Sequence, residues 1–374
     1  MRILLLSAYA AQSHTAWAGQ LQQMFNRWEW TVLEMPPRHF SWRVRGNPLH
    51  WSVTEKAVLS REYDLVLATS MVDLATLRGL VPALASKPTV LYFHENQFAY
   101  PHGASVHGLL EAQMVSLYAA LAADQVLFNS AYNRDSFLQG CGDLLQRLPD
   151  YVPGGIVQQL QAKSSVVPVP VAAPPAGGHG VPASHAADAA LQLLWVGRFE
   201  HDKGGELLLK VLRCLEELQV HYRVAVVGQQ FRQSPAAFAS IESDFAHRLT
   251  HFGYVQERAD YLGILSAADV VLSTAMHEFQ GIAVMEAVMS GCVPVVPDRL
   301  AYPEFYPAAN RYQQQAEDGP VQADNAARLI AAIAQDLAAW RRRLPDLSAY
   351  QPGTLADSYR AAFDAAVRVA NGSG

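Results

Sequence analysis

The sequence predicts an α/β fold made of two domains, each built on a doubly wound parallel sheet. Short apolar runs alternate with helical patterns along most of the chain, as they do where crossover helices join parallel strands. Residues 171–188 are rich in Pro, Gly and Ala, lack periodicity, and divide this alternation into two series. The length of 374 residues also exceeds a single core and suggests ~2–3 domains.

The first series covers residues 1–170. Its apolar runs predict six strands, at Ile3–Ser7, Thr31–Met35, Leu65–Ala68, Thr89–Phe93, Val126–Asn129 and Ser165–Val169. Its helical patterns predict four helices, at His14–Asn26, Val72–Leu80, Gly108–Ala122 and Tyr132–Leu138. Strands and helices in this order predict the first parallel sheet.

The second series covers residues 189–345, after the linker at 171–188. It predicts five strands, at Leu191–Val196, Arg223–Val227, Thr250–Phe252, Val270–Ser273 and Val293–Val296. It also predicts five helices, at Glu206–Leu218, Ala236–Arg248, Tyr261–Ala267, Ile282–Ser290 and Ala323–Arg342. A last segment, residues 346–374, contains one amphipathic helix at Thr354–Val369.

Composition narrows the class of protein. With 51% hydrophobic and 17% charged residues, the chain is typical of soluble globular proteins. The net charge of −6 does not indicate a nucleic-acid-binding protein, so any such contact would need a local basic patch.

Cys141, Cys214 and Cys292 form neither a disulfide framework nor a metal-binding pattern, which fits a reducing compartment. The apolar start is too short for a signal peptide, and no run reaches the ~18–20 residues of a membrane span. We therefore expect a cytoplasmic protein without membrane insertion.

A strand, a polar loop and a short helix form the clearest candidate site. Glu278 lies in the loop, Gly281 opens the helix, and Glu286 lies within it. The amides around Gln280, Gly281 and Ile282 would point at an anion, because the first N–H groups of a helix have no partner inside it. The two carboxylates could then reach different parts of one ligand. An ordinary βαβ unit is the alternative, since two glutamates at this spacing are weak evidence alone.

A second candidate element follows the first strand of the second domain. Gly197 allows a tight turn, and Arg198 and Lys203 come directly after it. Two fixed cations beside a helix N-terminus suit a diphosphate leaving group, whose charge grows in the transition state. A polar loop with two solvated cations is the alternative.

Two histidines of the first domain are further candidates. His94 follows the fourth strand, so we expect it at the carboxyl end of the sheet, facing a cleft between the domains. Ser13 is a plausible N-cap of the first helix, which would turn His14 toward the same cleft. A structural histidine that hydrogen-bonds a neighbour is the bland alternative for His94.

These elements resemble glycosyltransferase family 4. Glu278 and Glu286 match the Glu-x7-Glu signature of retaining GT-B glycosyltransferases, and Gly197, Arg198 and Lys203 match the Gly-Arg-x4-Lys-Gly element of family 4. The resemblance implies the retaining GT-B architecture, in which two Rossmann-like domains face a central cleft and the last helix returns to the first domain. It also implies that the reaction is metal-independent and needs no cofactor besides a nucleotide-sugar donor.

The same resemblance implies a role for each residue. Glu278 would bind hydroxyls of the donor sugar, and Glu286 the ribose of the nucleotide. Arg198 and Lys203 would hold the donor phosphates. His94 would line the reaction centre near the sugar. Gln280, Gly281 and Ile282 complete the expected donor site.

Other segments resemble more specifically the tRNA-queuosine mannosyltransferase family. They are Ser13-His14, residues 35–47 with Trp42-Arg-Val-Arg-Gly, the His94-Glu-Asn-Gln element, residues 126–133, and His277-Glu-Phe-Gln-Gly through residue 304. The family transfers mannose from GDP-mannose to queuosine at the wobble position of tRNA-Asp. The resemblance therefore implies a queuosine-containing tRNA as partner, with Ser13, His14 and Asn96 among the acceptor contacts. The chain departs from the family at Ala11-Gln12, where relatives carry Gly-Gly, and at Gln280, where relatives often carry an aromatic residue.

Residues 38–45 supply the local basic patch that the net charge lacks. Arg38, Arg43 and Arg45 would hold phosphates, and Trp42 would stack on a splayed anticodon base. Without the family resemblance, a loop with Trp42 in the core and solvated arginines would be the favoured interpretation.

Three functions remain in competition. The first is transfer of a sugar to tRNA, by front-face attack in which the leaving phosphate accepts the acceptor's proton. The second is a family 4 enzyme that acts on lipid or polysaccharide at the cytoplasmic face of the membrane. The third is a non-catalytic nucleic-acid-binding module of GT-B shape.

Overall fold

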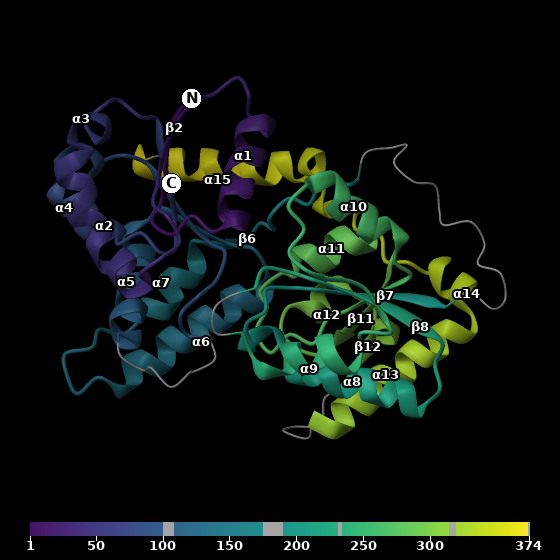
Figure 1. The fold of residues 1–374 in the computed structure, drawn as a ribbon. Helices are drawn as coiled ribbons and strands as arrows, with labels where there is room; N and C mark the ends of the chain where they lie inside the picture. Colours follow the sequence, from purple (N-terminus) through teal and green to yellow (C-terminus); the bar gives the residue numbers. More distant parts are fainter. Residues whose placement is uncertain (100–107, 175–189, 231–233, 314–318, 373–374) are drawn as a thin grey trace. The chain divides into compact units, whose positions relative to one another are not determined.

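The computed structural model describes residues 1–99, 108–174, 190–230, 234–313 and 319–372 (Figure 1). Residues 175–188 of the expected linker lie outside these ranges. The chain forms two compact units: unit 1 consists of Met1–Pro170 with Pro352–Gly374, and unit 2 of Val171–Gln351. The sequence predicts the C-terminal return at residue 346. The return begins later because Tyr350 still belongs to unit 2, where its carbonyl accepts the Val171 N–H at 2.8 Å.

Unit 1 is built on a parallel sheet of six strands in the order β2-β1-β3-β4-β5-β6. The strands are β1 (Arg2–Ser7), β2 (Glu29–Glu34), β3 (Leu65–Thr69), β4 (Thr89–Phe93), β5 (Gln125–Phe128) and β6 (Ser164–Val166). All of β3 and β4 is buried, as expected for strands of a parallel sheet that is covered on both faces.

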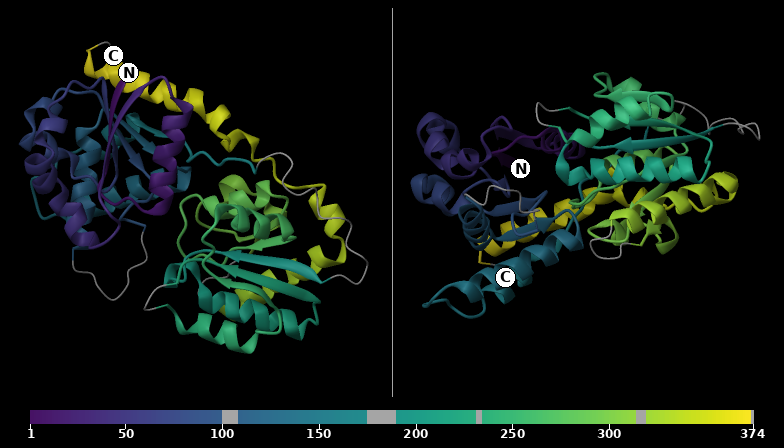
Figure 2. Two further views of the ribbon diagram at one scale, coloured as in Figure 1. Left: turned by 45° about the horizontal axis from the view of Figure 1, so that its top comes forward. Right: turned by 60° about the horizontal axis from the view of Figure 1, so that its bottom comes forward.

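Helices cover both faces of this sheet. Leu4, Val66 and Phe93 face one layer, formed by α2 (Phe40–Thr54), α4 (Leu74–Leu80), α5 (Leu109–Ala122), α6 (Ala131–Arg147) and α7 (Ile156–Ala162), with the short α3 (Lys56–Leu59) beside them. Tyr92 faces the opposite layer, formed by α1 (Gln12–Met24) and α15 (Pro352–Ala370) (Figures 1 and 2). There the Tyr359 hydroxyl accepts the Trp17 indole N–H at 2.9 Å and donates to the Tyr92 hydroxyl at 3.2 Å. The chain's last helix is thus hydrogen-bonded to its first helix and to the middle of the sheet.

Unit 2 repeats the plan, with the strand order β12-β11-β10-β7-β8-β9. The strands are β7 (Leu191–Val196), β8 (Tyr222–Val227), β9 (Leu249–Gly253), β10 (Val270–Leu272), β11 (Val293–Pro297) and β12 (Arg311–Tyr312). The layer of α8 (Gly205–Glu217), α9 (Ala236–Asp244) and α13 (Gly319–Gln335) packs on one face of the sheet (Figure 1). Helices α10 (Arg258–Ala267), α11 (Ile282–Met289) and α12 (Tyr302–Phe305) lie on the other, and α14 (Leu337–Arg341) follows α13.

Helix α2 is the main element that the sequence does not predict. It contains Gly46 and Pro48, both of which normally argue against a helix interior. The missing N–H of Pro48 leaves the Val44 carbonyl without its helical donor. The Asn47 side-chain amide takes that place, donating to the Val44 carbonyl at 2.9 Å and to the Arg43 carbonyl at 2.8 Å. The buried Asn47 side chain therefore compensates for the proline.

Smaller differences concern the ends of elements. Helix α6 continues to Arg147 and α9 ends at Asp244, whereas the sequence predicts ends at residues 138 and 248. The helix expected over 323–342 is divided at Asp336, whose carboxylate accepts the Ala339 N–H and caps α14. The expectation that Ser13 caps α1 is wrong, because α1 begins at Gln12 with Ala11 in the N-cap position.

Candidate functional site

Two loops of unit 2 lie against each other after the neighbouring strands β7 and β10. Both the Met276 N–H and the His277 N–H of the second loop donate to the Asp202 carbonyl of the first, at 2.8 and 3.2 Å. The Thr274 hydroxyl donates to the Lys203 carbonyl at 2.9 Å. These bonds fix the backbone of one loop against the other, so the side chains that both loops carry are held in a defined relation.

Gly204 makes this close approach possible. Its φ is +71°, in the left-handed region, and a Cβ built on it would lie 2.0 Å from the Thr274 carbonyl oxygen. Neither condition suits an L side chain, so the sequence needs glycine here.

Lys203 and Glu278 form the charged centre of the two loops. The Lys203 Nζ lies 3.1 Å from Glu278 Oε2, donates to the His277 carbonyl at 3.1 Å, and lies 3.5 Å from Asp202 Oδ2. Burial acts to lower the pKa of Lys203, but Glu278 and Asp202 outweigh it and hold that pKa above its usual value. Burial acts to raise the pKa of Glu278, but Lys203 outweighs it and holds that pKa below its usual value. Both groups are therefore charged near neutral pH.

The Glu278 carboxylate also lies at the amides that precede α11. Its Oε1 accepts the Phe279 N–H at 3.1 Å and the Gln280 N–H at 3.5 Å, and the Gly281 backbone also bonds the carboxylate. Gly281 has a φ of +78° and occupies the N-cap of α11, directly before Ile282. The Gln280 side chain is buried, with its amide 3.6 Å from the Met285 sulfur, so it points into the core. The backbone N–H of Gln280 is therefore directed at the Glu278 carboxylate, and its side chain contacts Met285.

Arg198 lies at the start of the first loop. Its guanidinium is 3.0 Å from Glu200 and 3.9 Å from Asp202, and 48% of its side chain is exposed. A half-exposed guanidinium on this loop can turn toward a phosphate by rotating its side chain.

Glu286 lies on α11 and is held by the neighbouring helix α10. Its Oε1 pairs with the Arg258 guanidinium at 2.6 Å, and its Oε2 accepts the Tyr261 hydroxyl at 3.0 Å. Burial and the Glu286 carboxylate raise the pKa of Tyr261, so its hydroxyl stays protonated and donates. The sequence predicts Glu286 but neither Arg258 nor Tyr261, because only the packing of α10 on α11 brings them together.

In unit 1, His94 and His14 are buried and stacked. Their rings are 4.1 Å apart with an interplanar angle of 19°, and the Trp17 and Tyr92 rings each pack 4.7 Å from His94. Within the described residues, the His94 Nε2 is buried and has no hydrogen-bond partner. Burial, together with His14, lowers the pKa of His94 well below its usual value. His94 is therefore a neutral imidazole, and its buried Nε2 has no hydrogen-bond partner among the described residues.

The neutral state of His94 makes unit 1 sensitive to acid. The pKa of His94 is lower in the folded chain than in the unfolded chain, so its contribution to stability is complete above ~6.5 and is lost as the pH falls below that value. We expect the melting temperature to fall more steeply between about pH 7.5 and pH 5.5 in the wild type than in His94→Phe. Thermal unfolding across this range measures the two slopes, and equal slopes would show that His94 does not carry the effect.

Ser13 and Asn96 are two further residues of unit 1 that the sequence predicts for the site. Ser13 is exposed in the first turn of α1. Asn96 is buried, and its amide donates to Asn133 and Ser136 while its carbonyl accepts the Phe98 and Ala99 N–H groups. Its hydrogen-bonding groups thus hold the segment after β4 on α6.

The basic residues predicted at 38–45 lie on or next to α2. Trp42 is 55% exposed, so the alternative with Trp42 in the core is wrong. The Arg43 Nε donates to the Pro36 carbonyl at 3.3 Å, and Arg45 pairs with Asp73, at the start of α4, at 2.7 Å. Arg38, just before α2, is exposed. Trp42, Arg43 and Arg45 are therefore presented by a helix, and Arg38 lies in the segment just before it.

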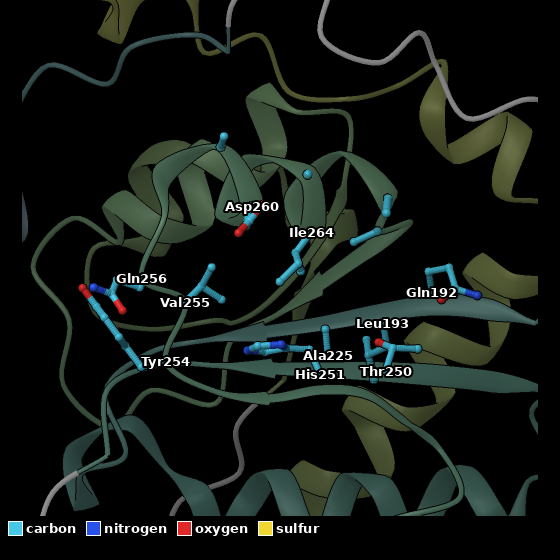
Figure 3. A pocket seen from close by; sticks show the side chains of 14 residues that line it. Gln192, Leu193, Ala225, Thr250, His251, Tyr254, Val255, Gln256, Asp260 and Ile264 are labelled. Atoms are coloured by element: carbon cyan, nitrogen blue, oxygen red, sulfur yellow. The ribbon is translucent and has the colours of Figure 1, made fainter.

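Unit 2 also has a hollow of about 780 Å³ between α10 and strands β7, β8 and β9 (Figure 3). The strands supply Leu193, Ala225 and Thr250 to its wall, and α10 supplies Asp260 and Ile264. Helix α10 thus covers these strands incompletely. The predicted donor residues do not line the hollow.

Among the residues that the structure describes, no group of three or more His, Cys, Asp or Glu side chains is arranged to hold a metal ion. Among the helices described, none is long and apolar enough to cross a membrane.

Two family models match the sequence. Residues 2–171 match the model for the N-terminal part of tRNA-queuosine alpha-mannosyltransferases, and residues 183–340 match the model for glycosyl transferases group 1. A tRNA-queuosine alpha-mannosyltransferase of Drosophila melanogaster is 34% identical over 315 residues, which cover 83% of each chain.

Solved structures establish the fold. The sucrose-phosphate synthase of Thermosynechococcus elongatus matches with a TM-score of 0.65 and 16% identity, over 99% of this chain and 98% of that one. A trehalose-phosphate synthase of Burkholderia vietnamiensis matches with a TM-score of 0.66 and 14% identity, over 99% and 98%. Like these proteins, the chain has the GT-B fold, as expected from the sequence.

Proposed function

This chain belongs to the tRNA-queuosine alpha-mannosyltransferase family and is a glycosyltransferase that modifies queuosine in tRNA, and we propose that it transfers mannose from GDP-mannose to the wobble position of tRNA-Asp. We place this reaction in the cytoplasm, where a tRNA substrate is available. The ion pair of Lys203 and Glu278 carries the proposal. It puts a fixed cation and a fixed carboxylate side by side near the N-terminus of α11, in unit 2.

In the proposed reaction the phosphate of the donor leaves from the face by which the acceptor hydroxyl enters. Lys203 and Arg198, with the amides around Gly281, stabilise the charge that grows on the diphosphate. The Glu278 carboxylate accepts hydrogen bonds from hydroxyl groups of the sugar and so orients the sugar. The Glu286 carboxylate accepts hydrogen bonds from the ribose hydroxyl groups. No metal ion is required by this arrangement of cations.

Unit 1 supplies the acceptor side of the proposal. His94 lines the reaction centre beside the sugar, and its neutral state fits that place, because an uncharged imidazole does not repel a developing oxocarbenium ion. His14 supports the His94 ring by stacking. Ser13, Arg38, Trp42 and Arg43 contact the tRNA, while Arg45 and Asn96 hold α2 and the segment after β4 in place.

Radiolabelled sugar transfer tests this function. GDP-mannose and UDP-sugars are offered in parallel to total tRNA from cells with and without queuosine. We expect label only from GDP-mannose and only in queuosine-containing tRNA-Asp, with an unchanged rate in EDTA. Label in a lipid fraction would favour a membrane acceptor, and loss of turnover in EDTA would contradict the metal-independent mechanism.

The ribose contact gives a quantitative prediction. Glu286→Gln should weaken GDP binding about 10-fold, because a charge-assisted hydrogen bond contributes about 1.5–3 kcal/mol. Tyr261→Phe should weaken it about 3-fold, because it removes one of the two bonds that orient the carboxylate. Calorimetry with GDP and 2′,3′-dideoxy-GDP measures both effects. The dideoxy ligand should bind all three proteins alike, and Tyr118→Phe in unit 1 serves as the control. Unchanged GDP affinity in Glu286→Gln would exclude the ribose role.

A further inference from the structure

Trp42 and Gly46 lie one turn apart on α2 and contact each other closely. A Cβ built on Gly46 would lie 2.6 Å from Cε2, 2.7 Å from Cζ2 and 2.8 Å from Cδ2 of the Trp42 ring. These are three consecutive atoms of the six-membered ring. Because the three distances are almost equal, the methyl would stand over the face of the ring and not beside its edge. The indole therefore lies flat on the helix, with Gly46 directly beneath it.

The arrangement leaves the outer face of the indole open. Gly46 is buried beneath the ring, whereas Trp42 remains 55% exposed. A tryptophan of this exposure at a helix surface presents a rigid apolar plane to the solvent. Glycine is a poor residue for a helix interior, and every other residue would push the ring off the surface. The pair thus fixes the orientation of the plane at the expense of helix propensity.

The surroundings of this plane are basic. Arg38 precedes α2, and Arg43 and Arg45 follow Trp42 on it, in a chain whose net charge is −6. Arg43 donates to the Pro36 carbonyl and Arg45 pairs with Asp73, so each guanidinium has a defined contact within unit 1. An open aromatic plane flanked by cations suits a stacked base with its phosphates.

We propose that the Trp42 indole, seated on Gly46, is a stacking platform for an unpaired base of the tRNA, and that Gly46 is a positioning residue for it. The proposal rests on the proposed function, because it takes tRNA as the acceptor. It goes beyond that function by assigning a role to a glycine that touches no substrate.

Four variants test the platform. Trp42→Ala removes it, Trp42→Phe keeps a smaller ring, and Gly46→Ala displaces the ring without changing it. Gly79→Ala is the matched control, since Gly79 lies within α4 and a Cβ there meets nothing within 4 Å. We measure the KM for tRNA, the KM for the donor, kcat and the melting temperature of each.

Gly46→Ala should raise the KM for tRNA about 10-fold, close to the effect of Trp42→Ala, because stacking on one aromatic residue is lost. Its kcat and donor KM should stay within about 2-fold of the wild type, and Trp42→Phe should recover part of the loss. Its melting temperature should equal that of the wild type or exceed it by about 1–3 °C, since alanine favours the helix. Gly79→Ala should share the thermal effect without the loss of tRNA affinity.

A second readout detects the stack itself. Anticodon stem-loops with 2-aminopurine at single unpaired positions should show quenched fluorescence at one position when bound to the wild type. The quenching should disappear with Trp42→Ala and with Gly46→Ala.

The outcomes distinguish the positioning role of Gly46 from the tRNA contact of Trp42. If Trp42→Ala raises the KM for tRNA and Gly46→Ala does not, Gly46 is not a positioning residue, but Trp42 still contacts the tRNA. If neither variant changes this KM, the tRNA contact of Trp42 is wrong as well. If the wild type sediments as a dimer and Trp42→Ala as a monomer, with unchanged KM, the surface belongs to a contact with a second copy of the chain. Absence of transfer to tRNA by the wild type would overturn the platform together with the proposed function.

Discussion

Replacing Lys203 by alanine should lower kcat by roughly 30- to 900-fold, which corresponds to about 2–4 kcal/mol of transition-state stabilisation. The Nζ is the cation closest to Glu278, and it is held by the His277 carbonyl and by Asp202 as well. Its loss removes a charge from the proposed diphosphate site. It also leaves the Glu278 carboxylate without its main partner, so the pKa of Glu278 should rise.

Steady-state kinetics with tRNA and donor measure this effect. Lys210→Ala is a suitable control, because Lys210 is exposed on α8 a short distance along the same chain segment. The melting temperature of both variants shows whether unit 2 remains folded. A Lys203→Ala enzyme with kcat near that of the wild type would remove Lys203 from the mechanism.

Replacing Gly204 by alanine should destabilise unit 2 by about 2–5 kcal/mol, the sum of a left-handed backbone and an overpacked contact. The backbone has a φ of +71°, and the new Cβ would meet the Thr274 carbonyl oxygen at 2.0 Å. This oxygen belongs to the backbone of the neighbouring loop, so it cannot rotate away as a side chain could. The two loops must separate, and the Lys203–Glu278 pair should separate with them.

Thermal and urea unfolding, followed by activity at a permissive temperature, measure both consequences. Gly263→Ala in α10 is the matched control, because a Cβ there meets nothing within 4 Å and alanine favours the helix. It should unfold at or above the wild-type temperature. Unfolding of Gly204→Ala at the wild-type midpoint would show that the loops relax at little energetic cost.

The sequence predicts the strands well and helix α2 poorly, for a physical reason. Buried parallel strands are continuous apolar runs, such as Leu191–Val196, and such runs are visible in the sequence itself. Helix α2 depends on Asn47, whose side-chain amide donates to the Val44 carbonyl that Pro48 leaves without a donor. That compensation depends on side-chain geometry, which the hydrophobic periodicity of the sequence does not reveal.

The candidate site shows the same division. Glu278 and Lys203 could be found because each lies in a loop directly after a strand of the sheet. Arg258 and Tyr261 could not, since their contact with Glu286 depends on how α10 packs against α11. The sequence also cannot tell that the polar groups of Asn96 and Arg45 bond other residues of unit 1.

The bonds of Tyr359 bear on the order in which the chain folds during synthesis. Trp17 and Tyr359 are 342 residues apart, yet they hydrogen-bond in one core. Unit 2 is one continuous stretch, Val171–Gln351, and leaves the ribosome before α15 does. Until α15 emerges, nascent unit 1 lacks one of the two helices that cover the Tyr92 face of its sheet. Unit 2 can therefore reach its native state before unit 1 does. Until α15 is added, unit 1 keeps apolar surface exposed, to which chaperones can bind.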